Sequence, residues 1–219
     1  MMCGRYYIGD SDEEERYLSK KLRSIIDEMQ RTNPEMSAQA HIGEIFPSEM
    51  APVLVAGDGG CTVRPMRWGF PRGGGSGLVI NSRSEKCDYT PMFQKAVRER
   101  RCLIPMSGFY EWRRTGSGGK TKDKFSFSLK EADEGEIMYL AGVYGEFIGG
   151  FAGGGFDGFA ILTQAADQQM SPYHERMPVI LRESSIKKAW LFAPPALPYS
   201  ELRRQFENPR LEIQSAVQV

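Results

Sequence analysis

The clearest pattern along the chain is a set of apolar residues that recur at helical spacing. These residues are Leu18, Leu22, Ile25, Ile26 and Met29. Ser11 and Glu14 precede them with the spacing of a capping box, in which two side chains satisfy backbone N–H groups at a helix start. The acidic residues at that end also suit the helix dipole. The pattern predicts an amphipathic helix that packs its apolar face on a core.

Most of the remaining chain shows short apolar runs separated by turn residues. Runs at 52–56 and 61–64 flank Gly57-Asp58-Gly59-Gly60, which predicts a β-hairpin because glycine and aspartate tolerate the positive φ of tight turns. Further strands are predicted at 4–8, 78–81, 109–113, 124–129, 137–144, 159–163 and 179–181. Two short helices are predicted at 92–99 and 185–192.

Three glycine-rich stretches, 73–75, 116–119 and 149–155, are expected to be loops. None matches GxxxxGK[ST], or GxGxxG between a strand and a helix, so no phosphate-binding loop is predicted. The elements together predict one α+β domain over residues 1–219, with a mixed, strongly curved β-sheet or open β-barrel-like core and peripheral helices. The proline-containing tail from about residue 194 is expected to be peripheral.

The composition limits the classes of partner. Hydrophobic residues make up 41% and charged residues 26%, which is typical of a globular protein in water. Lys plus Arg and Asp plus Glu number 28 each, so the formal net charge is zero and no global field attracts a polyanion. Any nucleic-acid site must therefore be a local patch. The arginines that could build one are Arg64, Arg67, Arg72, Arg83, Arg98, Arg100, Arg101, Arg113 and Arg114.

The four cysteines, Cys3, Cys61, Cys87 and Cys102, form no CxxC pair and have no zinc-like spacing to a histidine. We therefore expect no metal and no cofactor. No apolar run approaches the roughly 20 residues that span a bilayer. No hydrophobic segment precedes Cys3, so we expect a cytoplasmic protein with reduced thiols and no membrane partner.

Cys3 is chemically unusual because of its place in the chain. Removal of Met1 and Met2 would leave an amine and a thiol on adjacent carbons. An α-amine, with a usual pKa of roughly 7.7 to 8.0, can form an imine with an aldehyde near neutral pH. The thiol can then add to the imine and close a five-membered thiazolidine, helped by proximity. The alternative interpretation is a small buried hydrophobic residue.

Two other segments place polar groups in apolar or aromatic surroundings. Asn81 and Arg83 end an apolar strand, which is a usual place for site residues on a rigid scaffold. Glu111 lies among aromatic residues, where desolvation raises the pKa of a carboxyl group and suits it to proton transfer. Alternatively, Glu111 is a buried carboxylate paired with an arginine such as Arg113.

The chain has two histidines, and His174 is the better catalytic candidate because of its polar and aromatic neighbours. His41 has no charged residue beside it, which is typical of a surface or core histidine. Trp68 and Trp112 could stack on bases, since every base offers a π-face. Core packing is the alternative for both tryptophans.

Four motifs, taken together, resemble the SRAP family, the SOS-response-associated peptidase-like proteins understood as shields of abasic sites. The motifs are Met2-Cys3-Gly4-Arg5, Asn81-Ser82-Arg83-Ser84-Glu85, Ile104-Pro105-Met106-Ser107-Gly108-Phe109-Tyr110-Glu111-Trp112 and His174-Glu175-Arg176-Met177-Pro178-Val179-Ile180-Leu181. They stand in the family's order and reach from the N-terminus to beyond residue 180. The resemblance implies the family's mixed, barrel-like β core with helices around it.

The resemblance also implies a role for individual residues. Cys3 would be the nucleophile that crosslinks to the aldehyde of an abasic site, Asn81 would position its amine, and Glu111 and His174 would move protons. DNA contacts would come from Arg5, Arg83 and Arg176 on phosphate or sugar, from Trp68, Phe70 and Trp112 as base-stacking walls, and from Met177. The implied partner is single-stranded DNA that contains abasic sites, or a junction with duplex on one side. We expect a monomer that acts at the nucleoid.

Two positions depart from the family's motifs. Ser82 stands where alanine is more usual, a small-for-small change that should leave the chemistry alone. Met1 adds a residue before the usual Met-Cys-Gly-Arg start, and an uncleaved methionine would keep the Cys3 amine in an amide bond. We expect that translation begins at Met2.

Three alternatives remain open from the residues. The chain could be a thiol peptidase, or a self-cleaving one, with Cys3 as nucleophile and His174 as base. It could bind single-stranded DNA without a covalent bond, with Cys3 only structural. An abasic-site lyase activity could accompany the crosslink, with Glu111 as the base that removes a proton from the sugar.

Overall fold

The structure is a computed structural model that describes residues 4–9, 19–40, 42–73, 77–115, 121–130, 136–148 and 155–216. Its strands are β1 (Arg5–Ile8), β2 (Gly43–Ile45), β3 (Met50–Gly57), β4 (Gly60–Trp68), β5 (Phe70–Pro71), β6 (Leu78–Val79), β7 (Asn81–Arg83), β8 (Arg101–Met106), β9 (Gly108–Thr115), β10 (Thr121–Leu129), β11 (Met138–Phe147), β12 (Phe156–Ala165), β13 (Arg176–Pro178) and β14 (Leu211–Ala216). Its helices are α1 (Lys20–Thr32), α2 (Pro34–Ser37), α3 (Pro91–Gln94), α4 (Ala96–Glu99), α5 (Ser184–Phe192), α6 (Tyr199–Leu202) and the 3-10 helix η3 (Arg203–Gln205).

A closed ring of strands forms the centre of the molecule. Strands pair in the order β11, β8, β3, β4 and β12, and the ring closes because β12 also pairs with β11. The predicted hairpin is its β3–β4 pair, in which Asp58 and Gly59 make the turn. Side chains from all five strands fill the interior, including Val53, Met66 and Leu162. The predicted α+β fold with a barrel-like core is confirmed.

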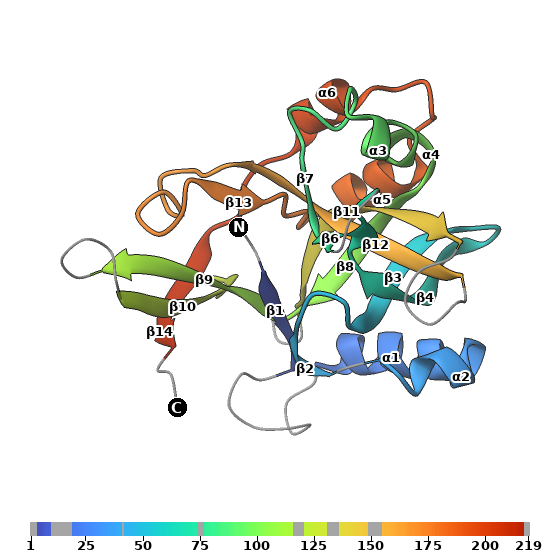
Figure 1. Ribbon diagram of the computed structural model, residues 1–219, viewed down its shortest axis with the longest axis horizontal. Coiled ribbons are helices and arrows are strands. Elements are labelled where there is room, and N and C mark those ends of the chain that lie inside the picture. The colour runs from blue at the N-terminus through green and yellow to red at the C-terminus, as the bar shows by residue number, and fades with distance from the viewer. Residues whose placement is uncertain are drawn as a thin grey trace.

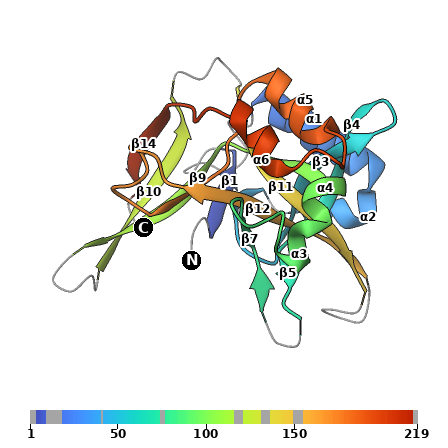
Figure 2. The same ribbon diagram turned by 90° about the horizontal axis from the view of Figure 1, so that it is seen from above.

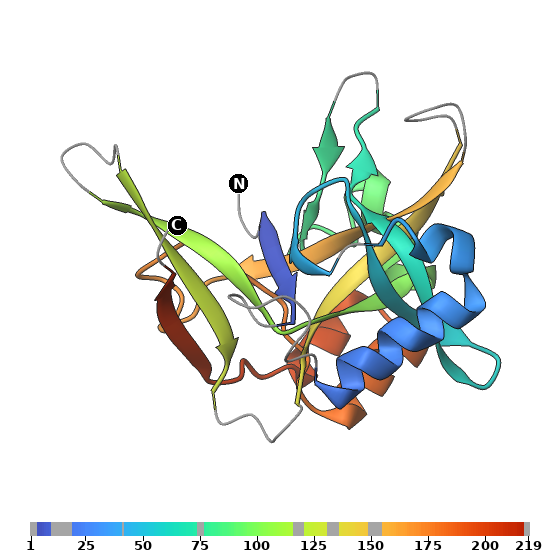
Figure 3. The same ribbon diagram turned by 90° about the horizontal axis from the view of Figure 1, so that it is seen from below.

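A second, open sheet lies beside this barrel, with the strand order β14, β10, β9, β1 and β2. Strand β1 lies between the barrel and strands β9, β10 and β14 (Figure 1, Figure 3). The chain passes from barrel to open sheet at Ser107, where β8 ends and β9 begins. Gly108 follows, and a Cβ there would lie 2.5 Å from the carbonyl oxygen of Phe127. Only glycine therefore fits this crossing.

The predicted amphipathic helix exists, but it begins later than expected. Ser19 has a ψ of 147°, which is not helical, and its hydroxyl accepts a hydrogen bond from the backbone N–H of Leu22 at 3.2 Å. The N-cap is therefore Ser19, and the first turn has no acidic residue. The residues of the expected capping box lie outside the described residues. The apolar face packs on the barrel as predicted, through Leu22, Ile25, Ile26 and Met29.

The C-terminal tail, expected to be peripheral, is largely exposed but anchors a few side chains in the core. Tyr199, Leu202 and Leu211 are all buried, and β14 pairs with β10 over its whole length. Buried Arg101 ties down the preceding segment by donating to the carbonyl oxygens of Ala193 at 2.8 Å and Leu197 at 3.2 Å. Figure 2 shows α3, α4, α5 and α6 gathered on the barrel side, away from β9 and β10.

The strand predicted at 179–181 lies a few residues earlier. Strand β13, at 176–178, makes the ladder with β12, whereas Ile180 makes only an isolated bridge with Leu140. The helix predicted at 92–99 is divided into α3 and α4, and the one at 185–192 corresponds to α5. The glycine-rich stretches expected to be loops lie largely outside the described residues.

Candidate functional site

A pocket with a volume of about 450 Å³ is lined by residues of β6, β7, β12 and β13 and of the segments beside them. Four residues singled out from the sequence line it: Asn81, Arg83, His174 and Arg176. The other lining residues are Arg72, Leu78, Val79, Ile80, Thr163 and Glu175. Three guanidinium groups thus border one small space, which suits an anionic ligand. We call it the site pocket.

Strand alternation explains which residues of two motifs reach the site pocket. Arg83 is the Cα partner of Thr163 on β12, and Arg176 is the partner of Ala165 two residues further along. Residues two apart on a strand share a face, so these side chains lie on the pocket face. Ser82 and Met177 alternate with them and are buried on the rear face.

Met177 therefore cannot contact DNA as expected. It is fully buried, and its sulfur lies 3.6 Å from the Asn208 side-chain nitrogen on the rear face. The reason is the same alternation that places its neighbour Arg176 in the pocket.

Arg176 is held by the protein itself. Its guanidinium makes a two-point ion pair with the carboxylate of Glu85, at 2.7 and 2.8 Å, and donates to the Thr163 carbonyl oxygen at 2.7 Å. Burial alone would raise the pKa of Glu85, but hydrogen bonds from Arg176 and from the Ala165 backbone outweigh it, and the pKa is lowered. No role was predicted for Glu85 or Thr163 from the sequence, although Glu85 lies within a motif.

Arg83 differs from Arg176 in its surroundings. It is exposed, and within the described part of the chain its side chain makes no hydrogen bond or ion pair. Arg72, also exposed, lies on the other rim. These two guanidinium groups can therefore contact a phosphate without breaking an existing pair.

His174 reaches the site pocket from the segment between β12 and β13. Its Nδ1 accepts a hydrogen bond from the Arg176 backbone N–H at 3.0 Å. The backbone N–H of His174 donates to the Met170 carbonyl oxygen at 3.1 Å. An imidazole whose Nδ1 is an acceptor carries its proton on Nε2 when neutral. His174 thus offers an N–H donor rather than a free base.

Glu111 is buried on β9, on the inner face of the open sheet. Its Cα partner is Phe125, so both side chains share that face. The ring of Tyr173, the residue before His174, packs on Phe125 at 4.7 Å. Glu111 and Tyr173, the residue before His174, therefore both lie on the Phe125 face of the open sheet. Arg113, which the sequence offered as a partner of Glu111, forms an ion pair with Asp123 at 3.6 Å.

The N-terminal strand enters the same region. Arg5 is the Cα partner of Tyr110, and Gly4 precedes it on the side of Glu111 because the two strands are antiparallel. Cys3 and His41 lie outside the described residues.

Burial raises the pKa of the Cys87 thiol to about 12 and that of the Cys102 thiol well above its usual value.

A cationic and aromatic surface covers the outer face of the open sheet. The Arg5 guanidinium lies 4.2 Å from the ring centre of Phe46 and 5.4 Å from that of Trp112. Its partner is Glu44, at 3.0 Å, which also binds Lys124 at 3.2 Å. Trp112 is half-buried, so part of its ring is accessible.

Trp68 and Phe70 are core residues, and their expected role as base-stacking walls is wrong. Trp68 is fully buried, packs on Tyr6 at 5.1 Å and donates from Nε1 to the Ile80 carbonyl oxygen at 3.1 Å. Phe70 is buried between Phe93 and Phe147. No base can reach either ring.

The model of the SOS response associated peptidase (SRAP) family matches residues 2–218. The chain belongs to the SRAP family. Its resemblance to Abasic site processing protein YobE of Bacillus subtilis is 34% identity over 113 residues, which is 52% of this chain and 48% of that protein. Abasic site processing protein YedK of Escherichia coli is 25% identical over 191 residues, 87% of this chain and 79% of that protein. The match thus spans about half the length of the Bacillus relative.

Two solved structures share the fold of this chain. A protein from Bordetella bronchiseptica aligns with a TM-score of 0.68 at 21% identity, over 99% of this chain and 100% of that one. One from Bacteroides thetaiotaomicron aligns with a TM-score of 0.67 at 20% identity, over 97% and 91%. In the described part of this SRAP chain, no helix is long and apolar enough to cross a membrane.

Proposed function

We propose that this SRAP protein captures abasic sites in single-stranded DNA through a covalent bond to Cys3. The observation that supports the proposal is that Asn81 and His174 line one pocket, while Arg5 at the start of β1 is the Cα partner of Tyr110, the residue before Glu111. The names of the relatives, abasic site processing proteins, agree with it. Cys3 directly precedes Gly4 in the sequence, and β1 begins at the next residue, Arg5.

The chemistry balances without an added reactant. The ring-opened sugar presents an aldehyde, and the Cys3 amine adds to its carbon to give a carbinolamine. Loss of one water leaves an imine. The Cys3 sulfur then bonds to the same carbon while the thiol proton passes to nitrogen, which closes a thiazolidine. The net reaction joins aldehyde and aminothiol and releases one water.

The described residues supply the proton transfers. Glu111 is buried among aromatic rings, where a carboxyl group can exchange a proton with the sugar oxygen or the carbinolamine. His174 offers its Nε2–H to the departing hydroxyl. Asn81, on the pocket face, would orient the amine through its side-chain amide. The same Glu111 carboxylate could remove a sugar proton from the imine, which would give a lyase side activity.

DNA binding is assigned to the two exposed cationic regions. Arg83 and Arg72 would contact phosphates at the site pocket, while Arg5 and Trp112 would hold a nucleotide on the outer face of the open sheet. Arg176 is assigned to positioning, because a phosphate would have to displace Glu85. A single strand suits this arrangement, since stacking needs unpaired bases.

A thiol peptidase is less well supported. Such an enzyme needs a base that takes the thiol proton, whereas the Arg176 backbone N–H already occupies Nδ1 of His174 and leaves the proton on Nε2.

The test is intact-mass analysis of protein that begins at Cys3 after incubation with an oligonucleotide carrying one abasic site. We expect one adduct whose mass is protein plus strand less one water, unchanged by borohydride because a thiazolidine is not reduced. A mass gain of two hydrogens with borohydride would indicate an imine only. No adduct, together with equal binding of abasic and intact strands, would favour a non-covalent binder.

A further inference from the structure

The segment 166–175, which carries His174, is organised around one carboxylate. Oδ1 of Asp167 accepts from the backbone N–H groups of Gln169 at 2.9 Å and Met170 at 3.0 Å. The carbonyl oxygen of Met170 then accepts from the His174 N–H. Asp167 therefore begins an Asx turn that reaches Met170. A second turn, closed by the Met170 carbonyl oxygen, follows it and ends at His174. The ends of the segment are joined by the Ala166 N–H, which donates to the Glu175 carbonyl oxygen at 3.0 Å.

Side-chain bonds tie the same segment to the C-terminal chain. Oδ2 of Asp167 accepts from the Asn208 amide at 3.2 Å. The Gln169 amide donates to the Pro209 carbonyl oxygen at 3.2 Å and accepts from the Leu211 N–H at 3.0 Å, so it pairs with the backbone as a neighbouring strand would. Asn208 in turn accepts from buried Gln164 on β12 at 2.7 Å. We call Asp167, Gln169 and Asn208 the rear brace.

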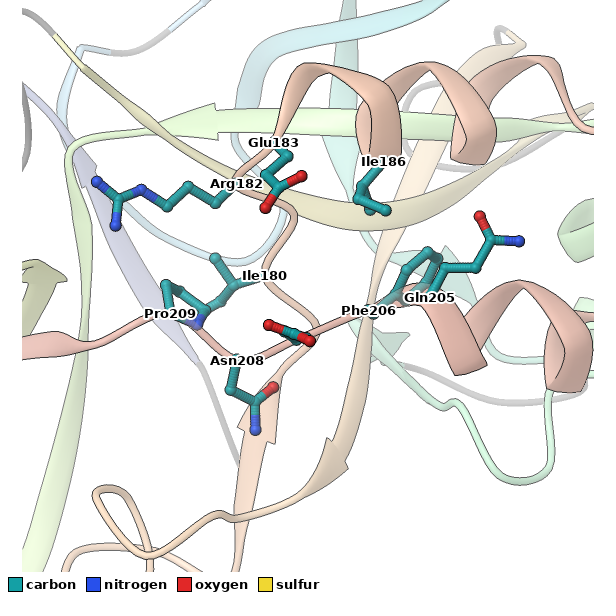
Figure 4. Close-up of a pocket in the computed structure, with 9 residues that line it drawn as sticks. Ile180, Arg182, Glu183, Ile186, Gln205, Phe206, Asn208 and Pro209 are labelled. Atoms are coloured by element: carbon teal, nitrogen blue, oxygen red, sulfur yellow. The ribbon is translucent and has the colours of Figure 1, made fainter.

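The rear brace lies on the opposite side of the sheet from the site pocket. Gln164 and Met177, which Asn208 contacts, occupy the rear face of β12 and β13. A second pocket of about 330 Å³ borders Asn208. Figure 4 shows Asn208 and Pro209 on one side of it, with the Asn208 amide turned away from Ile186. No member of the brace lines the site pocket.

We infer that the rear brace is a positioning device for His174. The brace fixes the turn that places the His174 imidazole in the site pocket. It does so through bonds to residues 208–211, which are distant from His174 in the sequence. The inference rests on the proposed function for its kinetic readout. It predicts that loosening the brace slows the covalent step and leaves binding of the strand intact, because none of its residues faces the DNA side.

The contact between Asp167 and Asn208 allows a swap experiment. Asp167→Asn retains an oxygen for the turn but sets one amide against another, and Asn208→Asp sets two carboxylates together. The double variant Asp167→Asn with Asn208→Asp restores a donor and an acceptor in reversed order. Asp58→Asn, in the exposed turn between β3 and β4, is the matched control.

At saturating abasic DNA we expect each single variant to crosslink about tenfold more slowly, since a mispaired hydrogen bond and a shifted catalytic group each carry costs of this order. The double variant should recover to within about threefold of wild type. The Kd for a strand with a non-reactive tetrahydrofuran analogue should change less than about twofold. Gln169→Glu removes the amide donor that faces the Pro209 carbonyl oxygen. It should also slow crosslinking about tenfold, and it replaces Asp167→Asn or Asn208→Asp in the test if either of these folds poorly.

Single variants that crosslink at the wild-type rate would overturn the inference, as would a double variant no better than the singles. The ring signals of His174 in NMR spectra, distinguished from those of His41 by a His41→Gln variant, give a readout that needs no reaction. They should shift in the singles and return in the double. If wild type forms no crosslink, the proposed function fails, whereas unshifted His174 signals in the singles would refute the brace itself.

Discussion

The two halves of the site, one on the barrel and one on the open sheet, are built in different ways. On the barrel side, Arg176 is fixed by Glu85 and the Thr163 carbonyl, and His174 is fixed by backbone bonds. On the open sheet, the Arg5 guanidinium lies over the rings of Phe46 and Trp112. The barrel side holds hydrogen-bonding groups in fixed directions. The open sheet presents the flat faces of aromatic rings and a guanidinium group.

Under the proposed function, this difference matches two requirements for handling a DNA strand. Chemistry at one sugar needs donors and acceptors held in place before the substrate arrives. Bases that vary in sequence need a surface that accepts any ring, which stacking on aromatic and guanidinium planes provides. Substitutions in the two halves should therefore change different observables.

The largest predicted effects distinguish the buried Trp68 from the half-buried Trp112. Trp68→Ala should lower the free energy of unfolding by about 3 to 5 kcal/mol, because it empties a fully buried site. Trp112→Ala should weaken binding of single-stranded DNA by about 1 to 3 kcal/mol and change unfolding little. Urea unfolding and fluorescence anisotropy measure the two quantities. A Trp68 variant that is stable yet binds DNA weakly would reverse the assignment.

Glu111→Gln should reduce the crosslinking rate about 100-fold, because the amide cannot exchange a proton. Affinity for a tetrahydrofuran-containing strand should stay the same. Single-turnover crosslinking on denaturing gels gives the rate, with exposed Glu212→Gln on the same sheet as the control. Equal rates in both variants would remove Glu111 from the chemistry.

Arg83→Ala should weaken binding of intact and abasic strands alike, by about fivefold near 0.1 M salt, because one phosphate contact is lost. The slope of log affinity against log salt should fall by about 0.7. Arg176→Ala should mainly lower thermal stability, since it leaves Glu85 without its partner. A full phosphate-type change of salt slope in Arg176→Ala would show that both arginines bind DNA.

The smallest effect concerns the pH dependence of the Glu85 pair. Because the folded-state pKa of Glu85 is lowered, its ion pair stabilises the fold above the usual pKa of 4.5 and is lost as pH falls through the lower folded value. The unfolding free energy of wild type should exceed that of Glu85→Gln at pH 7 by less than about 1 kcal/mol, since the pair is partly exposed. The difference should diminish as pH falls below 4.5 through the lowered folded-state pKa of Glu85, and exposed Glu207→Gln is the control.

Much of the fold could be predicted from local patterns. The β3–β4 hairpin has its turn residues at the right place, and the apolar spacing of Ile25, Ile26 and Met29 gave the buried face of α1. Strand β8 escaped prediction because all six of its residues are buried, so it shows no alternation. The start of α1 was misplaced because Ser11 and Glu14 match the capping-box spacing, whereas the N-cap of α1 is Ser19.

The site could be predicted only in part. The motifs identified Asn81, Arg83 and His174, which do meet in the site pocket. They could not separate Trp68 from Trp112, because burial depends on partners such as Tyr6 that are distant in sequence. The ion pair of Glu85 with Arg176 joins residues 91 positions apart, and no local signal marks it.

The most direct test of covalent capture is denaturing gel electrophoresis of the protein with a single-stranded oligonucleotide that contains one abasic site. Three proteins should be compared: one that begins at Cys3, one that retains Met1 and Met2, and Cys3→Ala. We expect a slower-migrating band only for the free N-terminal cysteine. A band of equal intensity in Cys3→Ala, or none in any of the three, would contradict capture by Cys3.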